Sequence, residues 1–226
     1  MIKVKPFCAL RPTEALVDKC AALPYDVMSS SEAREMVTGN PYSFLRVDRA
    51  EINLEKCVDI YSEIVYKTAK DTLDGYEKDG IYINDNERKF YFYRQIMGEQ
   101  SQTGIVGCAS VDDYLENRIK KHEFTRADKE IDRINHVDTC SAHTGPIFLC
   151  YKDSDTLDEI IERETSKEPI YDFVSEDGVR HTVWQTSSRE IDAKIEESFK
   201  SLDALYIADG HHRCASAVKV GLKRRE

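Results

Sequence analysis

Five consecutive residues near the end of the chain, Asp209-Gly210-His211-His212-Arg213, combine a carboxylate, a glycine and three donor-rich side chains. They follow the apolar run 205–208, which predicts a buried strand, and precede the helical pattern 215–222. A tight glycine turn between strand and helix leaves the first backbone N–H groups of the helix unpaired. The helix dipole adds positive potential at the same place. We therefore expect an anion site of the kind that holds phosphate at a helix N-terminus.

Two side chains of this turn have alternative interpretations. Arg213 is suited to grip two phosphate oxygens at once. Asp209 is suited either to cap the helix or to hold a metal ion beside the phosphates. A cap and a turn alone would explain Asp209 and Gly210, but not the three residues that follow. A zinc pair formed by His211 and His212 is disfavoured, because adjacent residues on a helix diverge by about 100°.

A second group of charged side chains precedes and enters another predicted helix. The pattern 127–137 is helical, with Ile131, Ile134 and Val137 on its expected buried side. Lys129, Arg133 and His136 are expected on a different face. For Lys129 and Asp132, a charged surface helix is the favoured interpretation.

His122 and Glu123 lie in a loop just before this helix, between Lys121 and Arg126. Here we favour a function. A carboxylate beside several cations can act as a general base if its surroundings set its pKa suitably.

The rest of the chain predicts an α+β fold with a mixed, short-stranded sheet and interleaved helices. Two hairpins are expected, and 54–78 is expected to be the longest helix. Predicted strands are 42–47, 81–84, 89–97, 102–111, 147–151, 169–174 and 179–185, and further helices are 111–115, 156–164 and 189–202. There is no internal repeat or low-complexity linker. An N-terminal α/β part (1–115) and a phosphate-binding part (116–226) are therefore expected with a soft boundary, and a single domain is the alternative.

Composition excludes several classes of protein. The 226 residues carry a formal net charge of -10, which argues against general nucleic-acid binding. No apolar run approaches the roughly 20 residues of a membrane span, and residues 1–6 lack a signal peptide's apolar core. We therefore expect a cytoplasmic protein.

Motifs exclude further classes. The seven cysteines form no Cys-x-x-Cys pair, so neither a disulfide framework nor a zinc ribbon is expected. The dinucleotide-binding, P-loop and nucleophile-elbow motifs are also absent.

The turn 209–213 also carries a resemblance. Gly210-His211-His212-Arg213 is similar to the Gly-Cys-His-Arg phosphate-binding turn of sulfiredoxins, and it resembles the Asp-Gly-His-rich turn of free-serine kinases with a ParB/sulfiredoxin-like fold. From end to end the chain resembles a bacterial and archaeal family of unknown function for which serine kinase activity has been proposed. The segments that carry this likeness are Lys5-Pro6-Phe7, Leu10-Arg11-Pro12, Leu23-Pro24-Tyr25-Asp26-Val27, Asn40-Pro41-Tyr42-Ser43-Phe44, Lys121-His122-Glu123-Phe124-Thr125-Arg126 and Ala208-Asp209-Gly210-His211-His212-Arg213.

The resemblance implies a ParB/sulfiredoxin-like core and a kinase that uses ATP or ADP with Mg²⁺ to phosphorylate a small hydroxylated metabolite, namely free L-serine. Glu123, His122 and Arg126 would be catalytic, with Glu123 taking the hydroxyl proton, and Asp209 would help to place the metal. The nucleotide or phosphate would be held by Gly210, His211, His212, Arg213, Lys121 and Arg133. Sulfiredoxins have a cysteine where this chain has His211, so sulfinic acid reduction is not expected.

A non-catalytic nucleotide- or phosphate-binding regulatory protein is the alternative. It keeps the same turn but gives Glu123 no role. Under either hypothesis the expected partners are a nucleotide and a small molecule, not nucleic acid or a membrane. Members of the resembled family usually run well beyond this length, so a site that further C-terminal residues complete is a third alternative.

Overall fold

The computed structural model describes residues 1–123 and 127–226, with only the backbone for 127–129. The chain forms two compact units, each assembled from three segments that are separate in sequence. The first unit comprises Met1–Asp18, Asn84–Lys120 and Leu149–Tyr206, and the second comprises Lys19–Ile83, Lys121–Phe148 and Ile207–Glu226. The boundary predicted after residue 115 lies inside the segment Asn84–Lys120 of the first unit.

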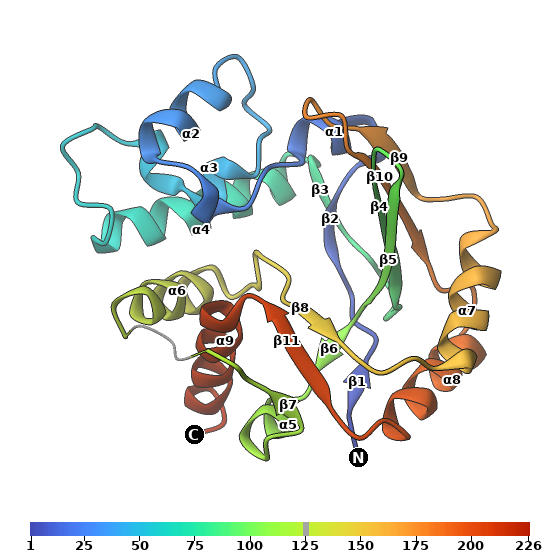
Figure 1. Ribbon diagram of the computed structural model, residues 1–226. Helices are drawn as coiled ribbons and strands as arrows, with labels where there is room; N and C mark the ends of the chain where they lie inside the picture. The colour runs from blue at the N-terminus through green and yellow to red at the C-terminus, as the bar shows by residue number, and fades with distance from the viewer. Residues whose placement is uncertain (124–126) are drawn as a thin grey trace. The chain divides into compact units, whose positions relative to one another are not determined.

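The first unit is organised around a four-stranded antiparallel sheet in the order β5-β4-β10-β9 (Figure 1). A shorter antiparallel pair joins β1 to β6, and β11 runs parallel to β7. The strands are β1 (Val4–Lys5), β2 (Leu10–Pro12), β4 (Tyr91–Met97), β5 (Gln100–Val106), β6 (Cys108–Ala109), β7 (Ile119–Lys120), β9 (Tyr171–Val174) and β10 (Arg180–Gln185), and the helices are a 3-10 turn at Glu14–Leu16, α5 (Val111–Leu115), α7 (Asp155–Thr165) and α8 (Arg189–Lys200).

Large apolar side chains on the sheet form the core of this unit. Phe92 of β4 lies opposite Trp184 of β10, and both are buried. Such cross-strand aromatic pairs are what stabilise an antiparallel pair of strands. Helix α7 packs on β4 and β10, and α7 and α8 contact each other. Leu157 of α7 and Ile195 of α8 are fully buried apolar residues of the two helices.

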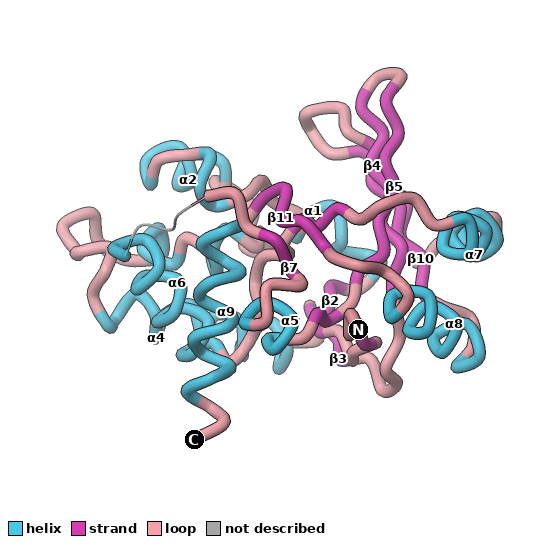
Figure 2. Tube along the Cα trace, turned by 60° about the horizontal axis from the view of Figure 1, so that its bottom comes forward, coloured by secondary structure: helices cyan, strands magenta, loops and turns pink. Residues whose placement is uncertain are grey.

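The second unit is mainly helical. Helix α6 packs against α9 and α4, and α4 also packs on α3 (Figure 2). Its elements are a 3-10 turn at Tyr25–Val27, α2 (Ser30–Met36), α3 (Leu45–Asp48), a 3-10 turn at Ala50–Asn53, α4 (Glu63–Lys78), α6 (Ala127–Cys140) and α9 (His211–Lys223). The chain crosses between the units within α1 (Val17–Cys20), β3 (Tyr82–Asn84), β8 (Phe148–Cys150) and β11 (Leu205–Asp209).

This mixed arrangement of helices and small, mainly antiparallel sheets confirms the predicted fold class. Both predicted hairpins are present, as β4–β5 and β9–β10. The strand predicted at 42–47 is wrong, because the chain turns there and enters α3 at Leu45. The helix predicted from residue 54 begins only at Glu63. Asp59 accepts a hydrogen bond from the backbone N–H of Tyr61 at 3.0 Å, a local turn that competes with helix formation.

Among the described residues, no helix is both long enough and apolar enough to span a bilayer.

Candidate functional site

Helix α9 begins immediately after Gly210, whose backbone is left-handed with φ 88°. A side chain is strained in that region, and a Cβ there would lie 3.2 Å from the Cζ atom of Arg213. On its other side Arg213 passes close to Gly145, where a Cβ would lie 3.3 Å from its Cδ atom. Two glycines therefore make room for one arginine at the start of the helix.

The guanidinium of Arg213 closes this turn. One terminal nitrogen donates to a carboxylate oxygen of Asp209, and the other donates to the carbonyl of Pro146. Asp209 is not the helix cap, because the cap position is Gly210 and it makes no side-chain cap bond. Each terminal nitrogen carries two N–H groups, so these two bonds leave further donors of Arg213 for phosphate oxygens.

His211, the first residue of α9, is 94% buried. Its Nδ1 atom lies 3.4 Å from Oε2 of Glu123, and its ring meets that of His122 edge to face at 4.4 Å between centroids. Its Nε2 atom is buried and has no hydrogen-bond partner in the part of the chain that the structure describes. The loop residues predicted to act with the turn 209–213 are therefore in contact with it.

The buried face of α6 differs from the one predicted. Ile131, expected to be buried, is 57% exposed, whereas Arg133 and His136 are buried. Arg133 donates from Nε to Asp132 at 2.9 Å and lies over the ring of Tyr25, 4.2 Å from its centroid. The described part of α6 thus turns charged side chains inward, where they are held by specific partners.

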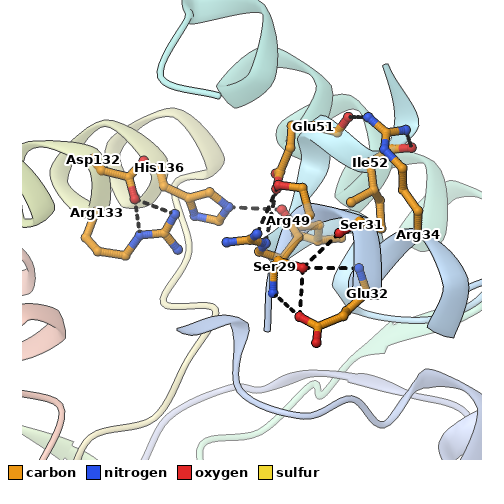
Figure 3. A network of polar contacts seen from close by, with 12 residues as sticks. Ser29, Ser31, Glu32, Arg34, Arg49, Glu51, Ile52, Asp132, Arg133 and His136 are labelled. Atoms are coloured by element: carbon orange, nitrogen blue, oxygen red, sulfur yellow. Dashed lines mark hydrogen bonds and ion pairs between the residues drawn. The ribbon is translucent and has the colours of Figure 1, made fainter. Parts of the chain in front are cut away.

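His136 is held in one orientation by α3. Its Nε2 atom lies 3.0 Å from the carbonyl oxygen of Val47, and because a carbonyl only accepts, Nε2 carries the proton (Figure 3). Burial and, to a lesser extent, the nearby charge of Arg133 lower the pKa of His136 from 6.5 to about 4. The ring is therefore neutral at pH 7, and its Nδ1 atom is an acceptor that has no partner within residues 1–123 and 130–226.

The start of α9 and the inward face of α6 form two walls of a pocket. A third wall comes from α3 and the 3-10 turn that follows it. Arg49 donates to Ser30 at 3.0 Å and lies 3.1 Å from the buried carboxylate of Glu51 (Figure 3). Burial raises the pKa of Asp48 to about 6, opposed by a hydrogen bond from Thr144 and by nearby arginines. The Oδ1 atom of Asp48 is buried, and none of the described residues forms a hydrogen bond with it.

These walls enclose a pocket of about 280 Å³ within the second unit. The predicted site residues among those that line it are Glu123, Arg133, Asp209, Gly210, His211, His212 and Arg213. Lys121 and His122 are exposed and do not line it, although His122 contacts His211. Arg126 lies outside the described residues.

The sequence predictions missed most of the opposite wall. Lining residues that were not predicted as site residues include Tyr25, Asp26, Asp48, Arg49, Glu51, Tyr61, Asp132 and His136. The segment 46–51, with its alternating cations and carboxylates, was a usable signal. The strand prediction for 42–47 covers the start of this segment and so hides its pattern of charges.

The cations of the pocket are fixed by carboxylates. Arg49 pairs with Glu51, Arg133 with Asp132 and Arg213 with Asp209. A guanidinium has five N–H donors, so pairing with one carboxylate leaves donors for an anionic ligand. Among the described residues no three His, Cys, Asp or Glu side chains are placed to hold a metal ion. A metal carried by phosphate oxygens and one carboxylate fits this donor set better than a protein-only cage.

The chain belongs to the family described as "Protein of unknown function (DUF1015)", whose model matches residues 4–226. No curated protein and no solved structure matches the chain.

Proposed function

We propose that this member of the family is a nucleotide-dependent kinase that phosphorylates a small hydroxylated metabolite, with free L-serine as the substrate implied by the resemblance to free-serine kinases. The observation that carries the proposal is the convergence on one pocket of Arg213 and His211 from α9, Arg133 from α6, and Glu123 from the preceding loop. Phosphoryl transfer depends mainly on positioning and on neutralising charge on the phosphoryl oxygens. A pocket rich in fixed arginines and imidazoles supports that chemistry.

The roles follow from position. The N–H groups at the start of α9 and the side chains of His212 and Arg213 hold nucleotide phosphates. Glu123 takes the proton of the acceptor hydroxyl. As it does so, the hydroxyl oxygen bonds to the transferred phosphorus, and the bond between that phosphorus and the leaving nucleotide breaks. Arg133 balances charge on the moving group. Asp209, with the phosphates, would hold Mg²⁺, which supplies further neutralisation of the phosphate charge when bound.

The likeness to ParB/sulfiredoxin-like proteins belongs to this proposal. It is supported by the sequence of strand β11, a left-handed Gly210 and then α9, which is the order a phosphate-binding turn requires. The arrangement accounts for a glycine at this position and for the crowding of donors just after it.

The direct test is incubation with ATP, Mg²⁺ and L-serine, followed by phosphorus NMR for phosphoserine. We expect phosphoserine and ADP with wild type. Glu123→Gln is expected to bind ATP as wild type does in a thermal-shift assay and to lose at least 100-fold in transfer rate, as general-base removal does. Equal transfer by the variant would remove Glu123 from the mechanism. Absence of transfer from ATP or ADP to any hydroxylated amino acid would contradict the kinase proposal.

A non-catalytic nucleotide sensor is the second candidate. It is favoured by one observation: the side chain of Glu123 is 62% exposed and paired with His211. A carboxylate that is largely in solvent is less firmly placed against a substrate hydroxyl than a buried one, as general-base catalysis requires. Tight ATP binding without transfer by wild type would establish this alternative.

A further inference from the structure

One part of the pocket is not used by the phosphate chemistry. Asp48 lies at the end of α3 and His136 lies on α6, and both line the pocket. Asp48 Oδ1 and His136 Nδ1 are both buried, and neither has a hydrogen-bond partner among the described residues. Buried polar atoms are nearly always paired in folded proteins, so two such atoms on one pocket require an explanation.

Both atoms are acceptors. His136 must carry its proton on Nε2 because that atom bonds to the Val47 carbonyl, so Nδ1 of the neutral ring offers a lone pair. The carboxylate oxygen of Asp48 likewise accepts hydrogen bonds. The two residues are linked through the chain, since the carbonyl that orients His136 belongs to the residue just before Asp48.

The charges around these two acceptors indicate which kind of ligand group would form hydrogen bonds with them. The positive charges of Arg133 and Arg213 reach Asp48, so the acceptors lie beside the cations assigned to phosphate. An anionic group would be repelled by Asp48 and could not donate to either atom. An ammonium or hydroxyl group supplies donors, and an ammonium also compensates the charge of the buried carboxylate.

We propose that Asp48 and His136 form a subsite for the hydrogen-bond donor group, an ammonium or a hydroxyl, of a small ligand whose other end faces the arginines. The choice of L-serine as probe rests on the proposed function. The subsite itself is tested by binding alone, without ATP.

Three probes that differ only in the donor at one carbon are L-serine with an ammonium, L-glycerate with a hydroxyl, and 3-hydroxypropanoate with neither. Affinities are measured by ligand-observed NMR titration. With wild type we expect affinity to fall in that order, at least 10-fold from first to last, because a missing donor leaves buried acceptors unpaired.

Two variants identify the residues responsible. Asp48→Asn removes the negative charge. In this variant the affinities of the three probes are expected to differ by less than 3-fold. His136→Gln keeps an N–H for the Val47 carbonyl but loses the acceptor at Nδ1, and is expected to weaken L-serine binding. His181→Gln is the matched control, since both nitrogens of that partly buried ring are already hydrogen-bonded, to Tyr93 and to Ser175. It is expected to bind all three probes as wild type does.

Equal affinity for the three probes, or an unchanged ranking in both variants, would overturn the subsite and leave ordered water as the partner of the two acceptors. Failure of wild type to bind any of the three probes would also overturn the subsite. The kinase proposal would then still be tested by measuring ATP turnover with other acceptor molecules. The expected ranking without phosphoserine formation would support the subsite and contradict the proposed reaction.

Discussion

The two units treat their buried polar groups in opposite ways. In the first unit the buried carboxylate of Glu164 accepts hydrogen bonds from Lys167 at 2.5 Å and from the backbone of Ser187 at 2.9 Å. Asp113, also buried, accepts from Arg118 at 2.7 Å and from the Lys3 backbone at 2.6 Å.

In the second unit, Asp48, His136 and His211 each have a buried side-chain atom that no described residue pairs with, and all three residues line the same pocket. An unpaired buried polar atom costs about 1–3 kcal/mol, so three of them weaken the unit that contains them. This pattern is expected where a protein gives up stability to keep a binding site ready. The first unit therefore pairs these buried carboxylates within the protein, whereas in the second unit the proposed ligand would supply the missing partners.

The largest expected effect concerns Asp48 and pH. Its pKa is raised from 3.8 to about 6 in the folded state, so the native protein binds this proton more readily than the unfolded chain. The stability that Asp48 contributes is therefore greatest below about pH 4 and is lost as pH rises through about 6, by about 3 kcal/mol at most. Asp48→Asn removes this dependence, so without ligand the variant is expected to be more stable than wild type at pH 7.5 and about equal at pH 4. Urea unfolding at several pH values measures this. A difference between the two proteins that does not change with pH would contradict it.

In the first unit a substitution of the same kind is expected to act in the opposite direction. Glu164→Ala leaves Lys167 and the Ser187 backbone N–H without their partner, at a cost of about 2 kcal/mol. Urea unfolding is the measurement, and ATP binding is expected to be unchanged. If the free energy of unfolding fell by less than about 0.5 kcal/mol in Glu164→Ala, the hydrogen bonds of Glu164 would not distinguish the first unit from the second.

The smallest expected effect comes from alanine substitutions that distinguish the cost of backbone strain from a loss of ATP affinity. Gly210 and Gly178 have nearly the same left-handed φ, 88° and 82°, but only at Gly210 would a Cβ contact Arg213. Alanine at either position is expected to cost about 1 kcal/mol of stability. Only Gly210→Ala is expected to weaken ATP binding, which a thermal-shift titration of both variants would show. Equal ATP affinity in the two would mean that displacing Arg213 has no consequence for the ligand.

The sequence predicted the local structure of this molecule better than its long-range contacts. The strand–glycine–helix order around Gly210 follows from local preferences, and so do both hairpins. The inward face of α6 was mistaken because periodicity places apolar residues inside, whereas Arg133 and His136 are buried through partners distant in sequence, Tyr25 and Val47. Such pairings are not visible in a hydrophobic pattern, since they depend on which elements the fold brings together.

The same limit applies to the pocket. The turn 209–213 and Glu123 were identifiable because their residue types are clustered along the chain. Asp48 was not, because its significance lies in an unpaired buried oxygen, which is a property of the packed structure.

The measurement that tests the central claim most directly is calorimetric titration of MgATP into wild type, Arg213→Ala and Arg224→Ala. Both arginines lie at the ends of α9 and pair with an aspartate, Arg213 with Asp209 in the pocket and Arg224 with Asp138 outside it. The account predicts that wild type binds MgATP, that Arg213→Ala loses at least 10-fold in affinity, and that Arg224→Ala binds as wild type does. No binding by wild type, or an equal loss in the two variants, would contradict it.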